Sequence, residues 1–163
     1  MKGCVVADTS ILRITMSGRK ASEPIAQKDI LATSKERAKN MEYLKETDFT
    51  EPTILIRVND EEKDPFKLYE RTRAAWGVNL ARAEKCKYAL CAYQGKVLEV
   101  YTIAGWFAAG STMMSDHVEK DKDKYEFVGN VAAKAIREKF VGKSIKNLSG
   151  ARGQNPTLYF GEK

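Results

Sequence analysis

Apolar positions along the chain fall into short runs bounded by turn residues, and the first clear runs predict β-strands. Residues 52–60 (PTILIRVND) are apolar and β-branched, with turn residues at both ends, which predicts a short strand. Residues 87–106 hold two apolar runs around Gln94-Gly95, where glycine at the second turn position suits a tight hairpin. Both runs are apolar on both faces, so we expect a central, buried hairpin.

Two further strands and three short helices follow from the rest of the pattern. Residues 125–131 (YEFVGNV) alternate in the manner of a strand, and residues 155–160 (NPTLYF) predict a last strand. The predicted helices are 64–76, 80–86 and 132–140.

The ends of the helices carry recognisable signals. Asp64 is a good N-cap and Pro65 suits the first helical position, while Gly77 is expected to end that helix. Asn79 is expected to cap the next helix, and Gly142 to end the last one.

The first fifty residues carry weaker patterns. We expect two short strands within residues 2–16 and a helix from Ser34 through Leu44. We therefore expect a single domain, 1–163, with 1–50 as an N-terminal extension and 51–163 as the core.

The order of elements predicts the fold class. No regular βαβ alternation is visible, because the order is strand, two helices, hairpin, strand, helix and strand. We predict an α+β fold, in which short helices decorate a small, strongly bent mixed β-sheet or barrel.

Composition adds a basic character to an ordinary globular chain. The 163 residues are 43% hydrophobic and 31% charged, with a formal net charge of +6. Seven basic and two acidic residues lie between Lys134 and Lys163, so this stretch carries most of the net charge. Such a cluster is typical of a nucleic-acid-binding face, although a merely solvated basic surface explains it as well.

Cysteine and histidine are too sparse for a metal site. Cys86 and Cys91 have no second pair, Cys4 is far away in sequence, and His117 is the one histidine. We expect no metal and no cofactor, and we expect Cys91 to be buried packing. No apolar stretch is long enough for a membrane span and no secretory signal is visible, so we predict a cytoplasmic protein.

The Gly142-Lys143-Ser144 tripeptide matches the end of a phosphate-binding P-loop, but its context does not. Arg137 stands where the motif needs its first glycine, and a polar helix precedes it instead of a buried strand. Residues 140–144 (FVGKS) resemble the second half of a GIY-YIG nuclease core, yet the candidate first half, CAYQG at 91–95, lies far upstream.

Aromatic, amide and basic residues remain as candidates for ligand contacts. Trp76 and Trp106 stand at the ends of elements, where tryptophan either stacks on a base or fills a small core. The loop GARGQNP (150–156) offers side chains that either read bases and phosphates or satisfy the turn's own backbone. The candidate nucleic-acid contacts are Trp76, Asn79, Trp106, Lys143, Arg152, Gln154 and Asn155.

Residues 53–160 resemble a family of small uncharacterised bacterial proteins. The resemblance is carried by ILIRV, LYERTRAAWGVNLARAEKCKYALCAYQGKVLEVYTIAGWF, YEFVGNVA, FVGKSI and GQNPTLYF. The order of elements is also similar to that of PUA-like domains, including the EVE type. That resemblance implies a small bent barrel that binds RNA or modified DNA bases in an aromatic-lined pocket.

Three functions stay open at this point. The first is a module that binds DNA or RNA, with a modified or flipped base as a candidate ligand. The second is a small nuclease or nucleotide-acting hydrolase using Tyr88, Tyr93, Glu99, Lys143 and Arg152, although Glu99 in mid-hairpin can equally face solvent or an arginine. The third is a protein-interaction factor without catalysis.

Overall fold

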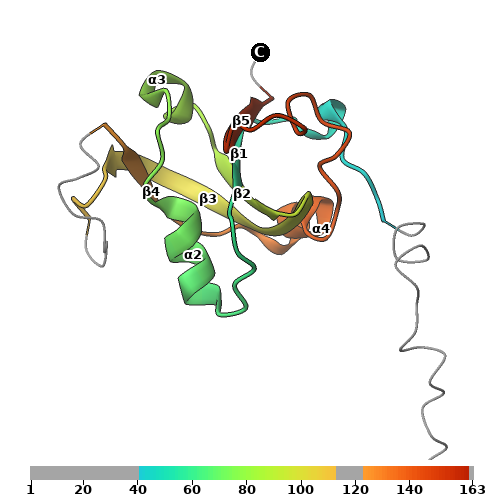
Figure 1. Cartoon of the computed structure of the whole chain (residues 1–163), viewed down its shortest axis with the longest axis horizontal. Coiled ribbons are helices and arrows are strands. Elements are labelled where there is room, and N and C mark those ends of the chain that lie inside the picture. Colours follow the sequence, from blue (N-terminus) through green and yellow to red (C-terminus); the bar gives the residue numbers. More distant parts are fainter. Residues whose placement is uncertain (1–40, 113–122, 162–163) are drawn as a thin grey trace, which may run out of the picture. The chain divides into compact units, whose positions relative to one another are not determined.

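A computed structural model describes residues 41–112 and 123–161 of the chain. These described residues form one compact unit. Its elements, shown in Figure 1, are η2 (Glu46–Asp48, a 3-10 turn), β1 (Thr53–Arg57), α2 (Pro65–Arg73), α3 (Leu80–Ala83), β2 (Tyr88–Tyr93), β3 (Lys96–Ala108), β4 (Tyr125–Val131), α4 (Lys134–Phe140) and β5 (Thr157–Phe160).

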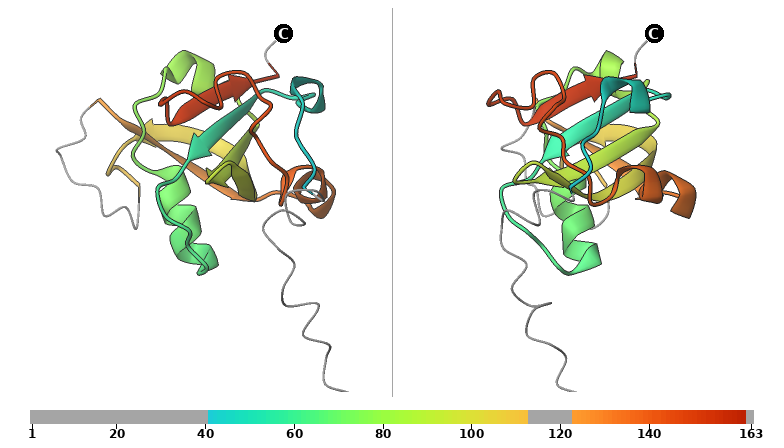
Figure 2. Two further views of the ribbon diagram at one scale, coloured as in Figure 1. Left: turned by 45° about the vertical axis from the view of Figure 1, so that its right-hand side comes forward. Right: turned by 90° about the vertical axis from the view of Figure 1, so that its right-hand side faces the viewer.

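The strands form one open, mixed sheet of five strands in the order β4-β3-β2-β1-β5 (Figure 2). β1 and β2 run parallel, and every other neighbouring pair is antiparallel. The predicted α+β class with a mixed sheet is confirmed. The sheet is not closed into a barrel, because β4 and β5 stand at its two ends.

The outer edge of β4 is occupied by the segment around α2, not by another strand. Trp76 and Tyr125 exchange two backbone hydrogen bonds of 2.9 Å, and the Gly129 N–H donates to the Tyr69 hydroxyl at 2.8 Å. This pairing explains why α2 ends at Arg73 and not at Trp76 as predicted: residues 74–76 leave the helix to reach the sheet edge.

Both faces of the sheet are covered, as the two-faced apolar strands predicted. Alternation along β1 sends Leu55 to one cluster of buried residues and Ile54 and Ile56 to the other. Phe140 of α4 belongs to the first cluster, whereas α2 and α3 pack into the second. The helices therefore lie on opposite faces of the sheet (Figure 1).

Most residues that were predicted to cap a helix or form a turn do so in the structure. The Asp64 carboxylate accepts from two backbone N–H groups at the start of α2, and Asn79 accepts from Arg82 at the start of α3. Gln94 and Gly95 both have positive φ, as a tight hairpin turn requires. Gly142, at φ +84°, lies just after Val141, the C-cap of α4.

The last residues of the predicted N-terminal extension belong to the core. Leu44 and Phe49 are buried in the same cluster as Phe140. The predicted helix through Leu44 is wrong at its C-terminal end, because the Leu44 N–H donates to the Ser144 carbonyl and residues 41–45 are not helical. The predictions for residues 1–40, Cys4 included, and for His117 lie outside the described residues.

Cys91 behaves as a packing residue. Cys91 is fully buried between β1 and β3 with a free thiol, which confirms its predicted role.

None of the described helices has the length and apolar character needed to cross a membrane.

Candidate functional site

The stretch from Ile145 to Pro156 gathers three of the seven candidate contacts on one surface. Arg152, Gln154 and Asn155 are all exposed, and the stretch leads directly into β5. It lies beside the tip of the β2–β3 hairpin, because the Ile145 N–H donates to the Gly95 carbonyl at 2.9 Å. We call residues 145–156 together with the hairpin tip, residues 93–96, the loop surface.

Arg57, the last residue of β1, holds this loop in place. Its Nη1 donates to the carbonyls of Ala151 at 2.9 Å and Gly153 at 2.8 Å. Its Nη2 donates to the Asn155 carbonyl, and Gly150 lies 3.5 Å away. One guanidinium thus donates to the carbonyls of Ala151, Gly153 and Asn155, while the Gly150 carbonyl also accepts from the Gly153 N–H at 3.0 Å.

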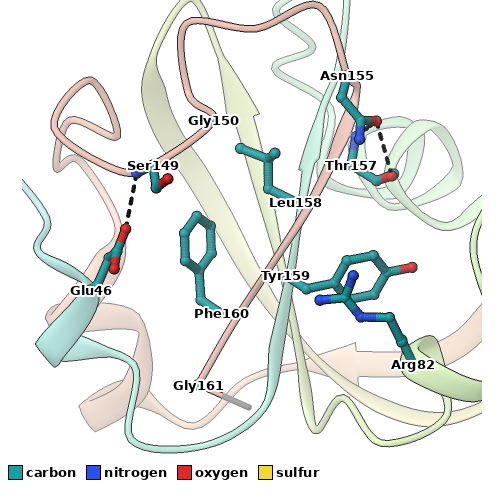
Figure 3. A pocket seen from close by; sticks show the side chains of 10 residues that line it. All are labelled: Glu46, Arg82, Ser149, Gly150, Asn155, Thr157, Leu158, Tyr159, Phe160 and Gly161. Atoms are coloured by element: carbon teal, nitrogen blue, oxygen red, sulfur yellow. Dashed lines mark hydrogen bonds between the residues drawn. The ribbon is translucent and has the colours of Figure 1, made fainter.

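Three hollows border the loop surface, and the first runs along β5. This edge pocket, of about 550 Å³, includes Asn155, Tyr159 and Arg82 in its lining. Figure 3 shows Leu158 and Phe160 on one side of β5 and Tyr159 on the other. The Arg82 guanidinium lies 4.3 Å from the centre of the Tyr159 ring. The Asn155 side-chain oxygen accepts from the Thr157 N–H at 3.2 Å, so this amide partly serves its own turn.

The second hollow, the basic pocket, has a volume of about 470 Å³. Lys146, Asn147 and Arg152 line it together with Glu46. The Glu46 carboxylate accepts from the Ser149 N–H at 3.2 Å, which ties η2 to the loop (Figure 3). The basic pocket borders the edge pocket, since Ser149 lines both.

The third hollow, the amide pocket, lies at the carboxyl ends of the parallel strands β1 and β2. Asn59 follows β1, Gln94 follows β2, and Gln154 comes from the loop. Its volume is about 410 Å³. Apolar walls complete the lining: Val58, Ile145, Ala151 and Pro156.

Basic side chains at this surface differ in their pairing. Lys143, just before the loop, pairs with Glu42 at 2.8 Å. Lys96, Lys146 and Arg152 are exposed and form no ion pair with any residue that the structure describes. The stem of Lys146 lies over Gly95, where an added Cβ would be 3.3 Å from the Lys146 Cε, which places this side chain beside the hairpin tip.

The other three candidate contacts lie away from the loop surface. Trp106 is 8% exposed and packs edge-on against Phe127, at 5.4 Å between ring centres. Trp76 is half-buried and its indole N–H donates to the Thr72 carbonyl at 2.8 Å. Asn79 is exposed and caps α3. None of the three lines any of the three hollows at the loop surface.

Glu99, the carboxylate of the hydrolase alternative, is engaged in a structural contact. Glu99 forms a two-point ion pair with Arg137, with both distances 2.7 Å, as expected for the alternative that it faces an arginine. This pairing raises the pKa of Arg137.

Glu126 is fully buried and holds the turn after β3 in place. It accepts from the N–H groups of Gly110 and Thr112 and lies 3.8 Å from Arg73. Burial lowers the pKa of Arg73, but its hydrogen bond to Glu70 and the nearby charge of Glu126 outweigh burial, and the pKa is raised. Among the described residues, no group of three or more His, Cys, Asp and Glu side chains is arranged to hold a metal ion.

Comparisons with protein-family models, curated proteins and solved structures found no match to this chain. Function is therefore inferred from geometry and charge.

The sequence prediction missed three residues that lie on or beside the loop surface. Arg57, Asn59 and Gln94 are distant from the loop in sequence, and only the parallel pairing of β1 and β2 brings them beside it. One signal was available, because parallel strands end at the same edge of a sheet, but the sequence did not show that these two strands are neighbours.

Proposed function

We propose that the protein is a nucleic-acid-binding module that contacts DNA or RNA with the loop surface. One observation carries the proposal: three basic side chains without an ion-pair partner among the described residues lie on the loop surface, beside hollows whose linings include neutral amides. The basic residues are Lys96, Lys146 and Arg152. Phosphates attract such side chains without regard to sequence, while amides discriminate between base edges.

The fixed shape of the loop supports the same function. A contact surface binds more tightly when its loop is already ordered, because less conformational freedom is lost on binding. Arg57 orders the loop in the free protein. In this proposal, Trp106 stays in the core and does not stack on a base.

A PUA-like relationship forms part of this proposal. It is supported by the order of elements, with a short helix followed by an apolar hairpin that reaches Trp106. The open sheet departs from the barrel that this relationship implies.

Binding to a panel of labelled DNA and RNA, with and without modified bases, tests the proposal at about 50 and 200 mM salt. Three phosphate contacts to a single strand predict a loss of affinity of roughly twentyfold between these concentrations. Absence of binding at low salt contradicts the proposal. A defined complex with a protein that survives nuclease treatment would point instead to a protein-interaction factor.

A further inference from the structure

We infer that the amide pocket takes up one unpaired base of a single-stranded nucleic acid and holds it by hydrogen bonds to its edge. This inference rests on the proposed function, since it assigns the ligand group that enters one hollow of the loop surface. Asn59, Gln94 and Gln154 carry the inference.

The charge inside the pocket favours a neutral ligand group. Among the described residues, no carboxylate and no lysine lines it, and its one charged residue is Arg57. The two Nη groups of Arg57 already donate to loop carbonyls. With both Nη groups bonded to carbonyls and Nε buried, Arg57 presents few donors to a phosphate, whereas Lys146 and Arg152 are exposed at the neighbouring basic pocket.

The polar groups of the pocket are available to a ligand. Within the described part of the chain, the side-chain amides of Asn59 and Gln154 have no hydrogen-bond partner. The Gln94 amide nitrogen donates to the Tyr93 hydroxyl at 2.9 Å, which orients that side chain and leaves its oxygen as an acceptor. Each amide offers donors and an acceptor, the combination that pairs with a base edge.

The shape of the pocket favours an unpaired base over a paired one. Its walls come from two sides, the hairpin tip with Gln94 and the loop with Gln154, and its volume of about 410 Å³ is typical of small-molecule pockets. A base in a duplex is stacked and has its pairing edge engaged. It enters such a hollow only after it leaves the stack, which costs least in a single strand.

One DNA sequence in three forms tests the inference on the full chain: a single strand, its duplex, and the single strand with abasic nucleotides. We expect the complete single strand to bind about tenfold more tightly than either of the other two. An RNA strand of the same sequence, titrated in parallel, distinguishes RNA from DNA as the source of the base.

Variants locate the base. Gln154→Ala and Asn59→Ala are each expected to weaken binding of the complete single strand about tenfold and to leave binding of the abasic strand unchanged. Asn130→Ala, which removes an exposed amide on β4, is the matched control and is expected to change neither. Thermal melts verify that all three variants fold.

The outcomes separate the two claims. The inference that the amide pocket binds a base is overturned if the complete and abasic strands bind equally. It is also overturned if Gln154→Ala and Asn130→Ala lose the same affinity. The proposed function still stands in either case if binding depends on salt. If no probe binds at low salt, both claims fall.

Discussion

At the scale of single residues, Arg57 determines the shape of the loop surface. Its guanidinium donates to several carbonyls at once through a planar fork that lysine cannot reproduce. We expect Arg57→Lys to lower the free energy of unfolding by roughly 1–3 kcal/mol and to weaken nucleic-acid binding. Urea denaturation measures the first effect.

Arg71→Lys is the control, because Arg71 forms an exposed ion pair with Asp60. Equal stability of the Arg57→Lys protein and the wild type would show that the loop holds itself together without the guanidinium.

The buried thiol of Cys91 makes the stability of the folded protein depend on pH in the alkaline range. Burial, the largest cause, raises the pKa of its thiol from 9.0 to about 11. Between these values the unfolded chain loses the thiol proton and the folded protein keeps it. Stability therefore falls as the pH rises through this interval, by roughly 2–3 kcal/mol in all.

The change Cys91→Ala removes this contribution. We expect the variant to be less stable at neutral pH, because it leaves a cavity, but to lose less stability than the wild type between pH 9 and 11. Denaturation at each pH measures both slopes, and parallel slopes would refute the prediction.

At the scale of elements, the pairing of β3 with β4 requires glycine at position 129. A Cβ there would lie 2.1 Å from the Thr102 carbonyl oxygen, so the strands would have to separate. We expect Gly129→Ala to destabilise the protein by about 2 kcal/mol or more in thermal or urea unfolding.

Gly77→Ala is the matched control, since an added Cβ at Gly77 meets nothing within 4 Å. It is expected to change stability by no more than about 0.5 kcal/mol. Comparable losses in the two variants would mean that β4 does not pair with β3 in the register described.

Local sequence signals predicted the elements well where each element carries its own signals. The cap at Asp64, the turn at Gln94-Gly95 and the alternation in residues 125–131 all lie within the element that they define. The end of α2 was missed because a tertiary contact decides it: Trp76 pairs with Tyr125, far along the chain.

At the scale of the whole molecule, strand order decides which residues meet, and this order was not readable from the sequence. Arg152 and Gln154 were chosen from a single exposed loop, and they remain together. Trp106 was chosen for its position at a strand end, but it packs against Phe127 of β4 within one of the two buried clusters. Open and closed sheets share the same strand patterns, so the barrel did not follow from them.

The central claim is that the basic side chains of the loop surface bind nucleic-acid phosphates. Its most direct test is the slope of log affinity against log salt concentration for a labelled single strand. The wild type is compared with Lys146→Ala and with Lys67→Ala, which removes an exposed charge on α2. We predict that Lys146→Ala makes the slope shallower by about 0.7 and that Lys67→Ala leaves it unchanged. Identical slopes for all three proteins would contradict the account.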